Sequence, residues 1–180
     1  MIRIDEFLVR TLPLTDPAGF ALAYPHPALT LRVPGAGPAP APRKAVSLHD
    51  TLDDEGLAAL LGDPLDRTHV AFLVKSERNP FGNIISVGRA ATNDVCVDHT
   101  SISKVHAVFT CVGSSWKVSD RKAKNGLYVN RVQLDAGATA PMEDGALIAF
   151  GTQVEGTFHT ARGLFNFLEL VRMRERTRRM

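Results

Sequence analysis

The stretch after His69 constrains the fold most strongly, because it divides into short apolar strands separated by turn residues. Seven such runs lie between residues 70 and 150: VAFLVK, NIISVGR, DVCVD, HAVFTCV, WKVSD, LYVN and ALIAF. Turn-forming residues separate them, for example Asn79-Pro80, Asn125-Gly126 and Asp144-Gly145. Short strands at intervals of roughly 8–12 residues are typical of an all-β sandwich or barrel. We therefore expect a mainly β chain in which residues 66–160 form one sandwich domain.

The segment before the expected sandwich has a different pattern of residues. Residues 1–33 predict a small extension of mixed, partly helical structure. Asp16 followed by Pro17 is a good helix start, since Asp is a favoured N-cap and Pro is tolerated in the first turn. The alternating run LTLRV at 29–33 favours a strand. This extension precedes the expected sandwich domain, and two arrangements stay open: a separate domain, or a segment that packs on the sandwich.

Three further segments complete the expected organisation. Residues 34–46 contain the run PGAGPAPAP, which predicts a semi-extended linker or a surface loop. Residues 47–64 predict a short helix with Leu57, Leu60 and Leu61 on one face. Residues 161–180 predict a C-terminal helix, because its apolar residues follow helical spacing at Leu164, Phe167, Leu168 and Val171.

The positive charge of the chain is concentrated at its C-terminal end. The formal net charge is +2 over 180 residues. Five arginines and one glutamate give the last nine residues a charge of +4, which leaves the remainder near −2. Such a tail is compatible with binding nucleic acid or an anionic membrane. One short arginine run fits the solvated end of a docked helix better, so we expect neither nucleic acid nor membrane as a partner.

The cysteines and the apolar runs point to a cytoplasmic protein. Cys96 and Cys111 lack the close spacing of zinc or thioredoxin-like sites, so we interpret them as reduced, small apolar residues. No stretch approaches the roughly 18 apolar residues that span a bilayer, and the N-terminus lacks a secretory signal pattern. No metal or cofactor is expected.

Several polar residues stand at the edges of the expected strands. Arg89 follows Gly88 at the end of an apolar strand, where its guanidinium could face a phosphate or a carboxylate. Ser103 and Lys104 could add a hydroxyl and a second cation. The Asn125 amide could donate to and accept from the main chain of an extended peptide.

His106 allows two interpretations. Its ring could hold a loop to the backbone, which we favour because the residue opens an apolar strand. Alternatively, it could act as a base for a nucleophilic Ser103. That hydrolase hypothesis is the weakest, because the serine lacks a Gly-x-Ser-x-Gly elbow and no acidic residue is nominated to orient the histidine.

Taken together, these residues resemble the forkhead-associated (FHA) domain, a phosphothreonine-binding module, of the kind found in bacterial proteins. The resemblance covers roughly residues 70–158, and it depends on the order and spacing of several short motifs rather than on any single one. These motifs are Gly88-Arg89, Asn93-Asp94-Val95, Ser103-x-x-His106-Ala107, Trp116 with Asp120, Asn125-Gly126, Val129-Asn130 and Asp144-Gly145.

The resemblance implies a sandwich of about eleven strands and a set of roles for the loop residues. Arg89 and Ser103 would bind the phosphate, with Lys104 as a further basic contact, and Asn125 would bind the peptide backbone. Four other residues would support the loops and the turn around Asn125: Gly88, His106, Gly126 and Asn130.

This chain departs from the family pattern beside Asn125. Hydroxyl residues usually precede the Asn-Gly pair, whereas the loop here runs from Arg121 to Lys124. A threonine commonly follows the pair, and here Leu127 does. Two interpretations remain open: Lys124, with Arg121 or Lys122, takes over a phosphate contact, or the loop is a solvated charged surface.

The expected function is phosphothreonine-dependent binding of a protein or peptide in Ser/Thr-kinase signalling, without enzymatic activity. The partner would be a Ser/Thr kinase or one of its substrates. The alternative is a scaffold that binds independently of phosphate, through the Leu57-Leu60-Leu61 or Phe165-Phe167 faces or through the basic C-terminal tail.

Overall fold

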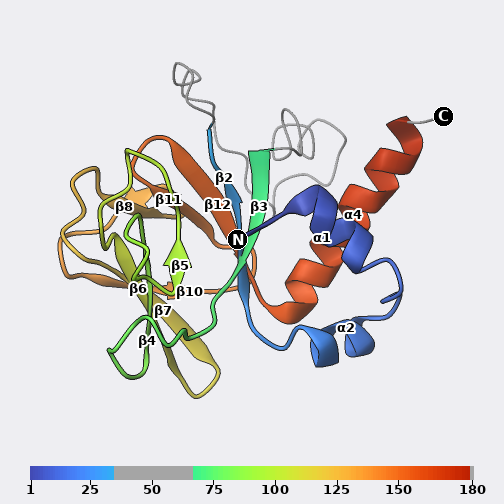
Figure 1. The fold of residues 1–180 in the computed structure, drawn as a ribbon, viewed down its shortest axis with the longest axis horizontal. Helices are drawn as coiled ribbons and strands as arrows, with labels where there is room; N and C mark the ends of the chain where they lie inside the picture. Colours follow the sequence, from blue (N-terminus) through green and yellow to red (C-terminus); the bar gives the residue numbers. More distant parts are fainter. Residues whose placement is uncertain (35–66, 179–180) are drawn as a thin grey trace.

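The chain forms a β-sandwich with a layer of helices on one side (Figure 1). The structure is a computed structural model that describes residues 1–34 and 67–178. The expected linker at 34–46, apart from Pro34, and the expected helix at 47–64 lie outside the described residues. So do the three leucines proposed as an apolar docking face.

Two sheets make up the sandwich, and each contains strands from separate stretches of the chain. The larger sheet has the order β1 (Ile2–Arg3), β3 (Thr68–Phe72), β2 (Ala28–Arg32), β12 (Val154–His159), β11 (Leu147–Phe150), β8 (Leu127–Val129) and β9 (Val132–Gln133). The smaller has the order β10 (Thr139–Met142), β7 (Ser115–Asp120), β6 (Ala107–Val112), β4 (Ile84–Gly88) and β5 (Val95–Cys96). The predicted mainly β sandwich is confirmed, with twelve strands among the described residues instead of about eleven.

The core between the two sheets is apolar and well buried. Phe109 and Val118 of the smaller sheet and Phe150 and Phe158 of the larger sheet are each at most 1% exposed. Leu127, which stands where the family commonly has threonine, is also fully buried in this core. Its side chain therefore packs in the core and does not contact a ligand at the loops. Burial stabilises the fold by about 25 cal/mol per Å² of apolar surface removed from water.

The N-terminal segment is partly built into the sandwich. Strand β2 pairs with β12 on one side and with β3 on the other. Strands β2 and β3 are thus neighbours in one sheet, although the domain boundary expected before residue 66 lies between them in the sequence. The strand expected at 29–33 is confirmed as Ala28–Arg32, and the helix start at Asp16 is confirmed by α2 (Pro17–Ala23), whose Gly19 amide donates to the Asp16 carboxylate at 2.7 Å.

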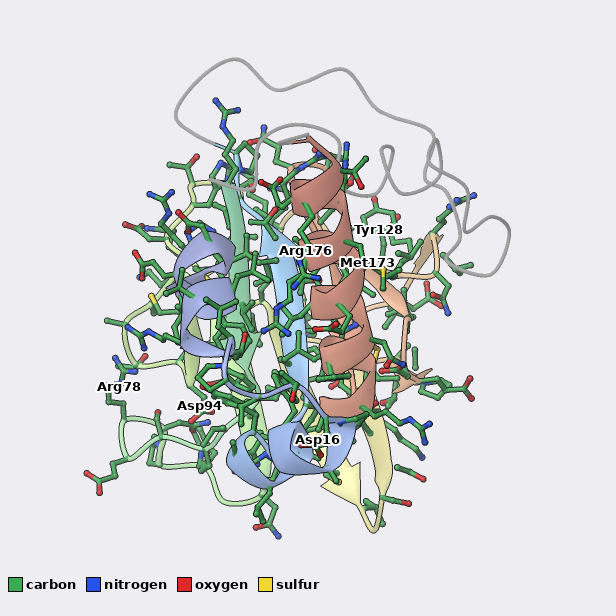
Figure 2. All side chains as sticks on the ribbon, turned by 90° about the vertical axis from the view of Figure 1, so that its right-hand side faces the viewer. Asp16, Arg78, Asp94, Tyr128, Met173 and Arg176 are labelled. Carbon is green, nitrogen blue, oxygen red and sulfur yellow. The ribbon has the colours of Figure 1, made fainter. Side chains whose placement is uncertain are left out.

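Three helices cover the outer face of the larger sheet (Figure 2). They are α1 (Ile4–Arg10), α2 and α4 (Ala161–Arg178), so N-terminal and C-terminal segments of the chain share one layer. In this second core Phe20 packs edge to face against Phe7 and Phe165, with ring centroids 6.5 and 5.6 Å away. The Phe165-Phe167 face is 6–7% exposed, so the scaffold alternative cannot use it. None of the helices in the described residues is apolar over a length sufficient to cross a bilayer.

Polar contacts fix the start of α4 to the sandwich. The Asp144 carboxylate accepts from the Thr160 amide at 2.7 Å and from its hydroxyl at 2.9 Å. A Cβ on Gly163 would lie 1.8 Å from the same carboxylate, so only glycine allows this approach. The adjacent His159 is 3% exposed, with Nε2 3.0 Å from the Thr30 hydroxyl. Burial lowers the pKa of His159 to about 4, against the opposing effect of Asp144.

Candidate functional site

Three loops meet at one end of the sandwich, and we refer to residues 89–94, 97–106 and 121–126 together as the loop cluster. The strand register brings them together, because Val87 at the end of β4 pairs with Ala107 at the start of β6. Ala107 in turn pairs with Asp120 at the end of β7. The three connections therefore lie at the same end of the strands of the smaller sheet.

Gly88 and Arg89 tie the first loop to the second. A Cβ on Gly88 would lie 2.4 Å from the Lys104 carbonyl oxygen, so glycine is required for this approach of two backbones. The Arg89 amide donates to the Ser103 carbonyl at 2.9 Å, and its side-chain Nε donates to the Ile102 carbonyl at 3.3 Å. The side chain is otherwise exposed, and its terminal amino groups have no hydrogen-bond partner within residues 1–34 and 67–178.

Ser103 joins the second loop to the third. Its hydroxyl accepts from the Lys124 amide at 3.0 Å, while its carbonyl accepts from the Arg89 amide. The half-buried hydroxyl keeps its own proton available as a donor. Lys104 and Lys124 have exposed side chains. Arg89, Ser103 and Lys124 are therefore consecutive links in one set of hydrogen bonds.

His106 supports the loops from below. The ring is fully buried and stands edge-on to Phe150, with centroids 5.3 Å apart. Its Nδ1 accepts from the Ser103 amide at 3.3 Å, so Nε2 carries the proton and donates to the Gly126 carbonyl at 3.0 Å. Burial lowers its pKa, against the effects of the Gly126 hydrogen bond and of Asp120. The ring thus binds backbone atoms, and no hydrogen bond joins it to the Ser103 hydroxyl in the described part of the chain.

The third loop ends at Asn125-Gly126. The Asn125 side chain is exposed, and its Nδ2 donates to the Ser101 carbonyl at 2.8 Å. Gly126 has a φ of +74°, which favours glycine, and its carbonyl also accepts from the Gly151 amide at 2.8 Å. The Asn125 carboxamide oxygen faces no hydrogen-bond donor among the residues that the structure describes.

Asn130 belongs to a different turn. Asn130 and Arg131 have φ values of +48° and +70°, and they connect β8 to β9 as a two-residue turn. The Asn130 side chain accepts from the Leu147 amide at 3.0 Å. The structure therefore does not bring Asn130 to the turn around Asn125, and Asn130 supports the start of β11 instead.

Asn93 holds the first loop against the second, a role that the sequence reasoning did not assign. Its side chain is 1% exposed, and Nδ2 donates to the Ala90 carbonyl at 2.8 Å and to the Lys104 carbonyl at 2.6 Å. The Ala90 amide donates to the same Lys104 carbonyl at 3.1 Å. The Asn93-Asp94 pair of the family pattern is the sequence signal for this role.

Asp94 is the most heavily hydrogen-bonded carboxylate of the described residues. It accepts from the Ser76 and Ser86 amides, each at 2.7 Å, from both serine hydroxyls, and from the Asn79 side chain. Its side chain is fully buried, and Lys75 lies 3.9 Å away. Burial alone would raise the pKa of Asp94, but these hydrogen bonds outweigh burial and lower it to about 2. The Asp94 carboxylate therefore stays charged and anchors the base of the first loop.

Comparison with known proteins assigns this part of the chain. Residues 85–151 match the family model described as FHA domain. They form an FHA domain. The match includes all three loops of the cluster and extends through β11, so the loop cluster lies inside the assigned domain.

One relative is similar to part of the chain. The chain is 36% identical over 55 residues to the glycogen accumulation regulator GarA of Mycolicibacterium smegmatis, an alignment that covers 31% of this chain and 35% of that protein. The chain thus spans about a third of the length of that relative.

Two solved structures are also similar. A crystal structure of the MEK1 FHA domain is 19% identical with a TM-score of 0.47, and the alignment covers 78% of this chain and 92% of that one. Mycobacterium tuberculosis EmbR in complex with a low-affinity phosphopeptide is 26% identical with a TM-score of 0.40, over 43% of this chain and 20% of that one.

Proposed function

We propose that the loop cluster binds a phosphothreonine-containing peptide and that the chain acts as a binding module in Ser/Thr-kinase signalling. The observation that carries this proposal is the linked set of Arg89, Ser103 and Lys124. It offers a guanidinium fork, a hydroxyl and an ammonium on three loops that hydrogen bonds hold together. The partner is a protein phosphorylated on threonine, either a kinase or one of its substrates. A cytoplasmic location is part of the same proposal.

The chemistry of the phosphate matches these groups. A phosphothreonine brings a charge of about −1.5 to −2 and three acceptor oxygens. The exposed amino groups of Arg89 can donate two parallel hydrogen bonds, as arginine does to carboxylates and phosphates. Ser103 and the lysines supply further donors. We propose a binding module without bond-cleaving activity, since His106 is engaged with the backbone and no base among the described residues is hydrogen-bonded to the Ser103 hydroxyl.

Asn125 would fix the peptide main chain. Its amide nitrogen already donates to the Ser101 carbonyl, which leaves the second amide hydrogen and the oxygen for the ligand. One donor and one acceptor suffice to hold an extended backbone beside the phosphate. The phosphate would then supply most of the affinity, and Asn125 would set the orientation of the peptide.

The test is a titration of matched peptides by fluorescence anisotropy. One library contains phosphothreonine, phosphoserine and unmodified versions of each peptide, and the proteins are the wild type, Arg89→Ala and Arg162→Ala. Arg162 is an exposed arginine of the helical layer and serves as the matched control. Arg89→Ala should weaken phosphothreonine binding by about 2–5 kcal/mol, or roughly 30- to 5000-fold, and leave the melting temperature unchanged. Phosphate-independent binding, or equal affinities of the three proteins, would refute the proposal.

A further inference from the structure

The loop cluster carries more positive charge than one phosphate requires. Five side chains with a positive charge are exposed there: Arg89, Lys104, Arg121, Lys122 and Lys124. A single phosphothreonine offers a charge of at most about −2. Like charges held close together repel one another, so a cluster of this kind favours a ligand with additional negative groups.

The five cations come from one small region of backbone. The carbonyls of Ser103, Lys104 and His106 accept from the amides of Arg89, Ala90 and Arg121 at 2.9, 3.1 and 3.0 Å. The Lys124 amide donates to the Ser103 hydroxyl. Lys104 belongs to the segment 103–106. The backbone amides of Arg89, Arg121 and Lys124 donate hydrogen bonds to that segment.

The conformation of the third loop is also fixed. The Asp120 carboxylate accepts from the Ala123 amide at 3.2 Å, which closes the loop over residues 121–122. Lys122 adopts a φ of +58°, a value that a residue other than glycine seldom has without a constraint from its surroundings. The lysines of this loop are therefore presented by a defined turn.

Nearby carboxylates do not neutralise these cations. Asp94 and Asp120 are buried or nearly so and accept backbone amides, and Asp98 is the one exposed carboxylate within the loop cluster. Over residues 1–34 and 67–178, the ion pairs involve Asp5, Asp94 and Glu169, and none includes any of the five cations. The positive charge is available to a ligand.

We infer that the loop cluster selects phosphothreonine peptides whose neighbouring residues are acidic. The inference rests on the proposed function, and it specifies the ligand: the phosphothreonine occupies Arg89 and Ser103, while Arg121 and Lys122 face a second negative group. That group is a carboxylate or a second phosphate. The charged loop that replaces the usual hydroxyl residues is then a specificity element.

The test compares five fluorescein-labelled probes at about 50 and 500 mM salt. They are a phosphothreonine peptide with neutral flanks, the same peptide with three glutamates, the same peptide with a second phosphothreonine, the unphosphorylated glutamate peptide, and a single-stranded oligothymidylate. The proteins are the wild type, the double variant Arg121→Gln/Lys122→Gln, and the control Arg10→Gln/Arg162→Gln. The control removes two exposed arginines from the helical layer and so the same charge.

The expected result is that an acidic flank or a second phosphate tightens binding about tenfold at low salt and much less at high salt. The Arg121→Gln/Lys122→Gln variant should lose this advantage and the control should keep it, with the two acidic probes showing which group is preferred. Equal affinities of the neutral and acidic phosphopeptides would overturn the inference and leave the proposed function intact. Comparable binding of oligothymidylate or of the unphosphorylated peptide would overturn it in favour of nonspecific polyanion binding. If no phosphopeptide binds, the proposed function fails as well.

Discussion

The polar residues beneath the loop cluster differ from those at its tips. Asn93, Asp94 and His106 have buried side chains, and each makes hydrogen bonds to two or more groups of neighbouring segments. Arg89 and Lys104 at the tips are exposed and make few such contacts or none. A buried polar group left without a partner costs about 1–3 kcal/mol, so the first set is selected for holding the fold. The second set is free to bind a ligand.

This difference separates two kinds of effect that a substitution can have. A change beneath the loops should lower the stability of the domain and alter binding only through loop position. A change at the tips should alter binding and leave stability within about 0.5 kcal/mol. Substitutions of Asp94 and Asn93 test this separation, and the pH dependence of His159 tests the cost of burying a polar group elsewhere in the fold.

Asp94→Ala should destabilise the domain by about 4 kcal/mol. The change removes the acceptor of three buried or half-buried donors, the amides of Ser76 and Ser86 and the side chain of Asn79, and each such loss costs about 1–3 kcal/mol. Urea denaturation measures the effect. Asp98→Ala removes an exposed carboxylate four residues away and should change stability by less than 0.5 kcal/mol. If Asp98→Ala lost as much stability as Asp94→Ala, the distinction between the buried and the exposed polar residues would be wrong.

Acidification should destabilise the protein through His159. Its pKa is about 4 in the folded state and about 6.5 in an unfolded chain, so the unfolded state binds the proton first as the pH falls. Stability is therefore lost as the pH decreases from about 6.5 to about 4, and the loss at pH 5 is about 2 kcal/mol. The lowered pKa of His106 acts in the same direction.

Denaturation of the wild type at pH 7 and pH 5 checks this dependence. A His159→Gln variant should show a weaker dependence on pH, while His26→Gln, which changes an exposed histidine, should match the wild type. The same slope in all three proteins would mean that His159 is not the group that titrates.

Asn93→Ala should cost only about 1 kcal/mol of stability. The two carbonyls that it binds keep other partners, since the Ala90 and Lys104 carbonyls also accept from the amides of Asn93 and Ala90. Phosphopeptide affinity should nevertheless fall severalfold, because Asn93 positions the Lys104 backbone without touching the ligand. Calorimetric titration measures this. Unchanged affinity at reduced stability would show that loop position is set elsewhere.

Sequence reasoning was most successful where local pattern and packing agree. Strands with continuous apolar runs were predicted correctly; the run HAVFTCV, for example, forms β6. Strands β10 and β12 were not identified, because TAPM and VEGTFH contain a proline and a glycine that weaken a strand pattern. Their pairing comes from tertiary neighbours, with β12 held between β11 and β2.

In the helical layer and in the site as well, contacts between segments distant in the sequence could not be predicted from local pattern. Helical spacing predicted the buried face of α4, but nothing local indicates that α1 and α2 pack beside it on the larger sheet. Arg89, Ser103 and Asn125 could be named from their order in the chain, and they stay predictions as ligand contacts. The roles of Asn93 and Asp94 depend on hydrogen-bond partners 8–18 residues away, which only the folded chain brings together.

The central claim is that the loop cluster binds phosphothreonine. The most direct measurement is a nuclear magnetic resonance titration of the wild-type chain with one phosphothreonine peptide and with its unmodified form. The account predicts that the phosphopeptide shifts the backbone amide resonances of Arg89, Ser103 and Lys124, while Gly163 and other amides of the helical layer stay in place, and that the unmodified peptide changes neither set. Shifts centred on the helical layer, or equal shifts from both peptides, would contradict it.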